Sequence, residues 1–441
     1  MFKNILCILL CLCTCLVLSG CDSFFAADTA ELLSPPTLSG EIYPIAQAIK
    51  ESVKGDYTFF YPARGDYRSA VVQIDIDSDG TLETFAFYSM LESETVTMNL
   101  NFIRLVDGNW ESLSQQKIVA GGVDMVDFCD LDNDGKKEIL VGWQIYGTSE
   151  MQLAVYSMTE NSISQRMLQR YTHFTTCDLN EDSKKEILII NSNPTESIYT
   201  AAVYVISSDG VTELSFCELD STSKTFNEPV VSTLSSGKPA VYIDEIKGVG
   251  AVTEVLFMEK GVLVNPLFKE DSRETSDTIR SASFPCADIN GDGIIEIPVQ
   301  KNVPSVTRSA LNEKLYLTEW CSFNGERLTV QQTTMINLDD NYYYTIPAKW
   351  SGKIAVLKDT DHHIREIYQY NPDEILVGES LIFFKTVSLT EWEVSDYAKD
   401  GAQIIETKDN TVFFCRISHT AKKEGVTLET VKNAFEIFET E

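Results

Sequence analysis

Four short acidic segments contain the residues of this sequence that are best suited to chemistry. In each segment, oxygen-bearing side chains stand at positions 1, 3, 5 and 9. The clearest copy reads Asp-Leu-Asp-Asn-Asp-Gly-Lys-Lys-Glu, from Asp130 to Glu138. A hard cation such as Ca²⁺ takes about six to eight oxygen ligands. Four carboxylates and the carbonyl at position 7 would supply most of them, so this spacing predicts a calcium-binding loop.

The other three copies have the same spacing, and all four provide candidate ligands. Three have glycine at position 6, where a sharp reversal is needed. The third copy has Ser183 there, and we expect it to bind metal most weakly. The predicted ligands are Asp75, Asp77, Asp79, Thr81 and Glu83; Asp130, Asp132, Asp134, Lys136 and Glu138; Asp178, Asn180, Asp182, Lys184 and Glu186; and Asp288, Asn290, Asp292, Ile294 and Glu296.

The residues after each loop indicate which elements position these ligands. An EF-hand carries its last acidic ligand at position 12, but position 12 of the clearest copy is Val141. The loop therefore closes three residues earlier and runs directly into the apolar segment Ile139–Trp143. This arrangement predicts a loop between two β-strands, not a loop between two helices.

The loops recur with a nearly fixed period. Their first aspartates are separated by 55, 48 and 110 residues, and the last spacing is close to two units of 55. Such a period in a β-rich chain is typical of a propeller, whose blades have four strands each. We predict a mainly β fold with about five to seven blades. The recognisable units are 66–117, 118–169, 170–222, 223–273 and 274–337, and the fourth has lost its acidic loop. Its segment Asp244–Gly248 lacks a third spaced ligand, so we assign no metal to it.

The four loops resemble the calcium loops of FG-GAP/VCBS repeats, which build the propeller of integrin α subunits and of many secreted bacterial proteins. The resemblance covers about residues 66–340 and implies that a cation stiffens the turn between two strands of a blade. Ser183, the missing fourth loop and the absence of Phe-Gly and Gly-Ala-Pro signatures depart from the family pattern. As a whole, the chain is similar to VCBS-repeat lipoproteins of Gram-positive bacteria.

The amino terminus resembles that of a bacterial lipoprotein. Lys3 and the apolar stretch from Ile5 to Leu18 form a secretory signal, and Leu18-Ser19-Gly20-Cys21 resembles a lipobox. The resemblance implies cleavage after residue 20 and a lipid on Cys21, which would attach the protein to the outer face of the cell membrane. Residues 21–40 would form a tether.

The flanking regions show other periodicities. Residues 41–65 contain a stripe of apolar residues at helical spacing and then a strand-like run. Residues 345–441 lose the 50-residue period and predict a small α+β domain that ends in an amphipathic helix, Thr427–Phe438. Six cysteines lie beyond Cys21: Cys129, Cys177, Cys217, Cys286, Cys321 and Cys415. Three of them, Cys129, Cys177 and Cys286, precede the first aspartate of a loop at nearly equivalent places, and we expect these to be small buried residues at strand ends. An exported protein can form disulfides, but no spacing among the six specifies one.

The charge and the missing motifs restrict the function. A net charge of −31 argues against nucleic acid and anionic lipid headgroups as partners. No nucleophile elbow, zinc-protease helix, phosphate loop or dinucleotide fingerprint is present. His362 and His363, beside Asp359 and Asp361, could serve a metal or act as a base. A solvated turn is the better explanation, because adjacent residues on a strand face opposite ways.

We therefore expect a membrane-anchored, calcium-binding module, monomeric and without catalysis, that binds an extracellular protein or glycan. One alternative is a carbohydrate-active enzyme that uses carboxylates on the propeller face. Another is an envelope-assembly factor.

Overall fold

The computed structural model describes residues 42–438, except 54, 93–94, 194–197, 224, 249, 282–283 and 307–314. The predicted signal, the tether and Cys21 lie outside the described residues. Within the described part of the chain, no helix combines the length and the apolar character that crossing a membrane requires.

The fold is mainly β, as predicted, and its strand ladders are antiparallel. A helix precedes the sheets and packs on the first of them, through Ile45 and Ile49, against Tyr88 and Ile103. The strands of the repeat region and the preceding helix are α3 (Ile42–Ser52), β1 (Tyr57–Phe59), β2 (Val71–Ile74), β3 (Glu83–Glu92), β4 (Thr95–Val106), β5 (Asn109–Cys129), β6 (Glu138–Ile145), β7 (Met151–Met158), β8 (Ile163–Tyr171), β9 (His173–Cys177), β10 (Glu186–Asn193), β11 (Ile198–Ser207), β12 (Gly210–Glu218), β13 (Thr225–Phe226), β14 (Val230–Thr233), β15 (Pro239–Lys247), β16 (Gly250–Glu259), β17 (Val262–Val264), β18 (Phe268–Lys269), β19 (Glu274–Thr275), β20 (Ile297–Val303), β21 (Leu315–Phe323), β22 (Leu328–Asn337) and β23 (Tyr342–Thr345).

Successive groups of strands form the repeating units. Strands β9 to β12 form one four-stranded sheet, and β20 to β23 form another that β29 extends. The first two units share the long strand β5, whose first half pairs with β4 and whose second half pairs with β6. The strand therefore runs without interruption through the predicted boundary between residues 117 and 118.

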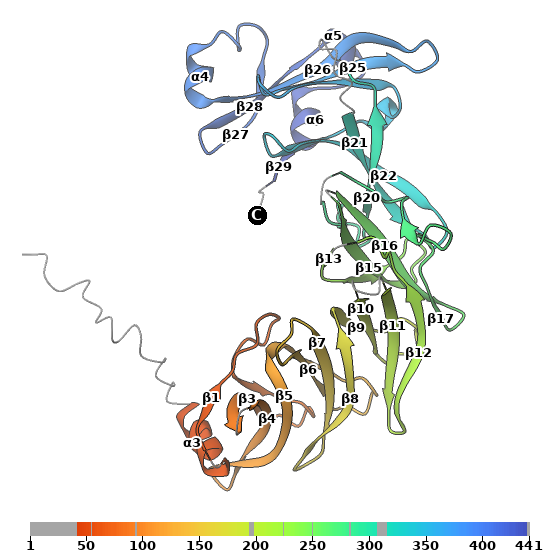
Figure 1. The fold of residues 1–441 in the computed structure, drawn as a ribbon. Helices are drawn as coiled ribbons and strands as arrows, with labels where there is room; N and C mark the ends of the chain where they lie inside the picture. Colours follow the sequence, from red (N-terminus) through yellow and green to blue (C-terminus); the bar gives the residue numbers. More distant parts are fainter. Residues whose placement is uncertain are drawn as a thin grey trace, which may run out of the picture.

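The sheets follow one another along an open arc (Figure 1). The sheet that contains β3 lies at one end, and the sheet that contains β26 and β28 lies at the other. No strand pairing among the described residues joins these two ends. Hydrogen bonding between strands therefore produces an arc of sheets and does not close a ring.

The hydrophobic core lies between neighbouring sheets, because each strand buries alternating side chains on both faces of its sheet. Trp143 is fully buried in the second unit, and its indole N–H donates to the Tyr156 hydroxyl at 3.2 Å. The three cysteines that precede the loops, Cys129, Cys177 and Cys286, are buried, which confirms their interpretation as packing residues. Cys321 and Cys415 are also buried, and Cys217 is half-buried.

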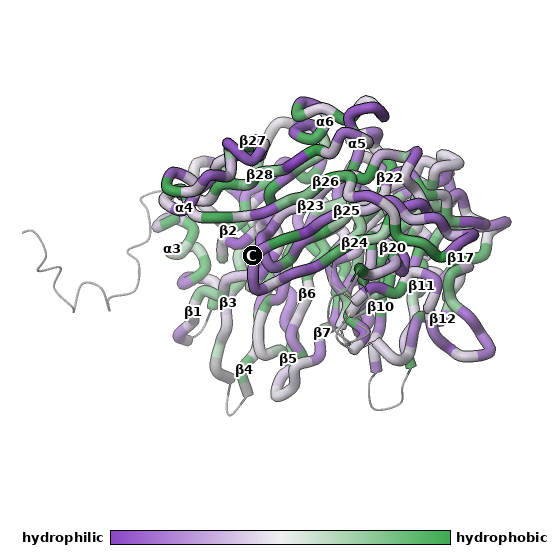
Figure 2. Tube along the Cα trace, turned by 90° about the horizontal axis from the view of Figure 1, so that it is seen from above, coloured by the Kyte–Doolittle hydropathy of each residue, from purple (hydrophilic) through white to green (hydrophobic). Residues whose placement is uncertain are grey.

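The C-terminal part contains η1 (Ala348–Trp350), β24 (Ile354–Asp359), β25 (Ile364–Asn371), β26 (Leu376–Ser388), α4 (Leu389–Val394), β27 (Gln403–Lys408), β28 (Thr411–Ile417), α5 (His419–Lys423), α6 (Leu428–Asn433) and β29 (Phe435–Ile437). Its five-stranded sheet has the order β24-β25-β26-β28-β27. Viewed from above, apolar and polar stretches alternate along β26 and β28 (Figure 2). Strand β28 is buried on both faces, because Phe413 and Cys415 pack into one hydrophobic cluster and Val412 and Phe414 into another.

The helix predicted at Thr427–Phe438 is wrong in its second half. The Thr427 side chain accepts a hydrogen bond from the Thr430 N–H and caps α6, at the predicted start of the helix. The helix ends at Asn433, however, and the chain then enters strand β29. This strand pairs with β23, and the Phe435 ring stacks on Tyr342 with centroids 4.8 Å apart. The edge of β23 offers backbone partners that a lone helix lacks, so tertiary pairing overrides the local helical pattern.

Candidate cation-binding loops

Each acidic segment lies where the first strand of its unit turns into the second. The segment Asp75–Glu83 joins β2 to β3, Asp130–Glu138 joins β5 to β6, and Asp178–Glu186 joins β9 to β10. The fourth, Asp288–Glu296, leads into β20 after an isolated bridge between Ala287 and Glu296. The predicted position of the loops between two strands is confirmed.

All four loops have the same internal hydrogen bonds. The glutamate at position 9 is buried, and its Oε2 accepts the N–H of position 2 at 2.8–3.1 Å, as in Leu131 to Glu138. The carboxylate at position 1 accepts the N–H of position 6, as in Gly135 to Asp130 at 3.1 Å. The carboxylate at position 5 accepts the N–H of position 7, and these donors are Thr81, Lys136, Lys184 and Ile294.

Position 6 has a left-handed backbone in every loop. Its φ is 86° at Gly80 and Gly135, 85° at Gly293 and 69° at Ser183. Only glycine adopts this region without a steric penalty from Cβ. The serine therefore strains the third loop at the position where the other three have glycine.

Three loops bring their acids close enough to share one ion. The carboxylate oxygens of Asp75, Asp77 and Glu83 lie within 4.8 Å of one another. Equivalent groups form in the second loop from positions 1, 3 and 9 and in the third from positions 1, 5 and 9: Asp130, Asp132 and Glu138; Asp178, Asp182 and Glu186. The sequence prediction of clustered ligands therefore agrees with the geometry of these three loops, while the fourth loop forms no such group among the described residues.

Buried carboxylate oxygens without donors distinguish the first two loops. Asp77 Oδ1, Asp130 Oδ1 and Asp132 Oδ1 are buried and have no hydrogen-bond partner. A buried acceptor without a partner costs about 1–3 kcal/mol, and more when it is charged. A cation at the centre of the loop would satisfy these oxygens, so the residues present fit a hard cation.

The third and fourth loops have asparagine at position 3, which supplies an internal donor. Asn180 Nδ2 lies 2.6 Å from Glu186 Oε1 and 3.3 Å from Asp182 Oδ2. Asn290 Nδ2 lies 3.2 Å from Glu296 Oε1. An amide N–H thus partly satisfies the carboxylates that face the candidate ion position, and the need for a cation is smaller in these loops.

Burial, with a smaller contribution from the charges of Asp132 and Asp134, raises the pKa of Glu138 to about 7 against the hydrogen bonds from Leu131 and Ser157. Burial also raises the pKa of Glu186 and of Glu296. Each glutamate thus lies in an environment that disfavours its own charge. A bound cation would remove that penalty by placing positive charge beside the carboxylate.

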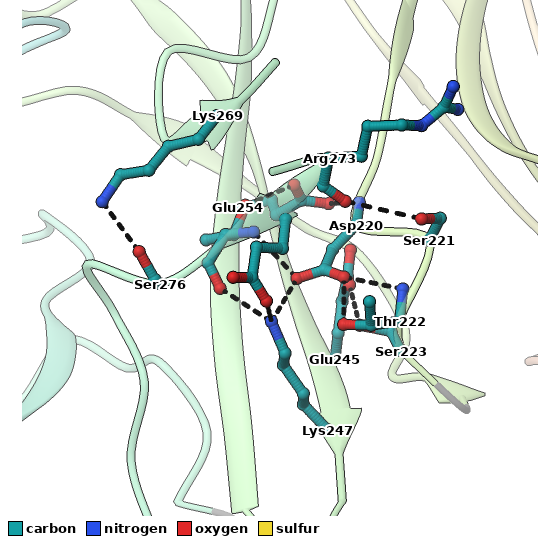
Figure 3. A network of polar contacts seen from close by, with 12 residues as sticks. Asp220, Ser221, Thr222, Ser223, Glu245, Lys247, Glu254, Lys269, Arg273 and Ser276 are labelled. Carbon is teal, nitrogen blue, oxygen red and sulfur yellow. Dashed lines mark hydrogen bonds and ion pairs between the residues drawn. The ribbon is translucent and has the colours of Figure 1, made fainter. Parts of the chain in front are cut away.

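The fourth unit contains a different buried polar network, which the sequence did not indicate (Figure 3). Lys247 Nζ lies 3.0 Å from Asp220 Oδ2 and 2.7 Å from Glu274 Oε2. Glu254 accepts the N–H of Asp220 at 3.2 Å. Burial and the neighbouring Glu254 raise the pKa of Glu245 well above its usual value. The ammonium of Lys247 therefore balances part of a carboxylate cluster whose members come from four separate segments.

His362 and His363 occupy the exposed turn between β24 and β25. Their side chains are 70% and 55% exposed, and each Nδ1 contacts a carboxylate, that of Asp359 and that of Asp340 respectively. The two rings therefore do not converge on one carboxylate. The solvated-turn interpretation describes His362, whereas His363 borders the cavity described below.

No protein-family model and no curated protein matches this chain. Among solved structures, it is similar to the periplasmic gluconolactonase PpgL of Pseudomonas aeruginosa, with 11% identity, 72% of this chain and 86% of that chain covered, and a TM-score of 0.30. It is also similar to a rhamnogalacturonan lyase of Bacillus licheniformis, with 13% identity, coverage of 74% and 76%, and a TM-score of 0.32. These scores lie well below 0.5, so the function must be inferred from the residues of this chain.

Proposed function

We propose that this protein is a calcium-stabilised array of FG-GAP/VCBS-type β-sheet units, arranged in an open arc, that serves as an extracytoplasmic binding module. It would be attached to the cell membrane through a lipid on Cys21 and would present its surface to a protein or glycan ligand. The observation that carries the calcium proposal is the set of buried, unpartnered oxygens on Asp77, Asp130 and Asp132. Carboxylate oxygens are the ligands that Ca²⁺ prefers.

Calcium would act here as a structural ion. The side chains at positions 1, 3, 5 and 9 and the carbonyl at position 7 would hold it, and in the first three loops the glutamate at position 9 begins the second strand. The ion would therefore fix the geometry of the turn relative to the sheet. Its positive charge would offset the repulsion among acids in a chain with a net charge of −31.

The burial of Glu245 and Glu254 favours a binding role over a catalytic one. Glu245 and Glu254 are adjacent carboxyls of the kind that acid–base catalysis uses, but both are fully buried. Neither lines any of the three cavities bordered by Asp340, by Arg365 and by Trp350. A substrate would have no access to them.

Thermal unfolding of residues 22–441 in excess Ca²⁺ and in chelator tests the calcium proposal. A ligand that binds only the native state stabilises it by about 2.7 kcal/mol per site at a hundredfold excess over Kd. We expect a clear rise in Tm that Asp132→Ala combined with Asp134→Ala reduces. An equal Tm in the two conditions would refute structural calcium binding.

The anchor is tested separately in cells that export the full chain. The protein should fractionate with membranes, and Cys21→Ser should release it to the soluble fraction, because the thioether-linked lipid can no longer form. Membrane association that persists unchanged in Cys21→Ser would contradict the lipid anchor.

A further inference from the structure

A cavity lies in the C-terminal part, away from the acidic loops. Its volume is about 760 Å³, within the range of small-ligand sites. It is bordered by the turn 338–341, the turn 360–363, the end of β26, the turn 409–410 and the residues after β29. The cavity thus depends on strand β29, which brings Ile437 and Phe438 to its wall.

One side chain in this cavity has a polar atom without a partner. Thr386 is 9% exposed, and its Oγ1 is buried with no hydrogen-bond partner. Its backbone N–H donates to the carbonyl of His363 at 3.2 Å. Buried hydroxyls normally have partners, so the Thr386 hydroxyl has unused hydrogen-bonding capacity in a residue that lines the cavity.

His363 is held in a fixed orientation at the cavity wall. Its Nδ1 lies 2.6 Å from Asp340 Oδ1, and the Asp340 side chain is only 3% exposed. Asn337 Nδ2 donates to the other oxygen of Asp340 at 2.7 Å. A carboxylate at Nδ1 selects the tautomer with hydrogen on Nδ1. In the neutral ring, Nε2 therefore offers a lone pair that can accept a hydrogen bond from a ligand.

The remaining lining is rich in acceptors and includes apolar rings. Carboxylates of Asp339, Glu391 and Asp409 line the cavity, whereas Lys408 is its single lysine. Phe413 and Phe438 provide aromatic carbon. This combination suits a ligand with many hydroxyl donors and apolar C–H faces, and the excess of carboxylates disfavours an anionic one.

We propose that this cavity binds a neutral oligosaccharide, with hydrogen bonds to Thr386 Oγ1 and His363 Nε2 and with sugar C–H faces against Phe413 and Phe438. The inference rests on the proposed binding function and names its ligand class and its site. The sugar would bind without a covalent step. A site on the C-terminal sheet would leave the calcium loops free for their structural role.

Isothermal titration calorimetry of residues 22–441 with cellotetraose, maltotetraose, mannotetraose and chitotetraose tests this site. We expect at least one of them to bind, and Thr386→Val and His363→Ala each to weaken that binding at least tenfold. Thr212→Val, an exposed threonine on β12, should leave it unchanged. Tetragalacturonate, the anionic control, should not bind.

Each opposing result overturns the proposal. No heat from any neutral tetramer would refute it, as would equal binding by the parent and both cavity variants. Tighter binding of tetragalacturonate, or of the amine-bearing chitosan tetramer, would replace the neutral sugar by a charged ligand. A calcium-dependent Tm with no saccharide binding would refute only this site, while saccharide binding with no calcium effect would refute only the calcium scaffold.

Discussion

Gly142 on β6 makes room for the hydroxyl of Tyr171, the last residue of β8. A Cβ on Gly142 would lie 2.0 Å from that hydroxyl oxygen. The hydroxyl donates to Asp124 Oδ2 at 2.5 Å, and the Arg64 guanidinium contacts the same carboxylate at 2.8 Å. Arg64 also pairs with Glu228 of the fourth unit. One glycine thus permits a polar contact that connects the early and later units of the arc.

Gly142→Ala should therefore destabilise the protein. The new methyl group would overpack the site, which costs about 1–3 kcal/mol. Displacement of Tyr171 would also remove its hydrogen bond to the charged Asp124 carboxylate. Urea unfolding should show a lower midpoint. Gly121→Ala is the matched control, because its new Cβ would meet its nearest neighbour at an ordinary 3.6 Å. Equal midpoints for the two variants would show that Tyr171 relaxes freely.

Asn180→Asp should increase the calcium response of the third loop. The change removes the amide N–H that lies 2.6 Å from Glu186 and adds a carboxylate among acids. The variant should be less stable than the parent in chelator and should gain more in Tm on addition of Ca²⁺. Asn161→Asp adds the same charge at an exposed turn and should not change the response. A smaller calcium response in Asn180→Asp would argue against a cation at this position.

Ser183→Gly should stabilise the third loop. Ser183 has a φ of 69°, where a Cβ is unfavourable. Relief of this strain is worth on the order of 1 kcal/mol, reduced by the greater freedom of glycine in the unfolded chain. Urea unfolding of the variant and of the parent, both in chelator, measures the change in the free energy of unfolding without a contribution from bound metal. Gly135→Ser tests the reverse change at φ 86° and should destabilise. Stabilisation by both substitutions would contradict the strain argument.

Glu245 should make stability depend on pH. Its pKa is raised by burial and by Glu254, whereas the unfolded value is about 4.3. Between the unfolded and the folded pKa, Glu245 binds a proton in the native state but not in the unfolded state. The free energy of unfolding therefore decreases as pH rises toward the folded pKa. Urea unfolding between pH 5 and 8 should therefore show a shallower decrease in Glu245→Gln than in the parent. Glu393→Gln, at an exposed position on α4, should retain the parental slope. Identical slopes in all three proteins would show that Glu245 does not cause the pH dependence.

The acidic loops were predictable because their ligands lie within nine consecutive residues. A short segment with aspartates at alternate positions and glycine at position 6 can form its turn with few distant contacts, as the Gly135 to Asp130 bond illustrates. The glutamate at position 9 is also readable, because it begins the next apolar run. Gly142, inside a strand pattern, was a weak signal of close approach, but the sequence could not identify Tyr171 as the approaching group.

The tertiary structure alone decided the features built from distant residues. Asp220 contacts Lys247 and Glu254, which are 27 and 34 residues later in the sequence. His363 contacts Asp340, which lies in the turn between two strands of another sheet. The second half of the last predicted helix is strand β29 because β23 has an edge that pairs with it. The spacing of residues along the sequence therefore determined which residues form the loops and that the fold is mainly β. The arc, the buried carboxylate network and the C-terminal cavity depend on strand pairing and packing between segments that no short sequence pattern connects.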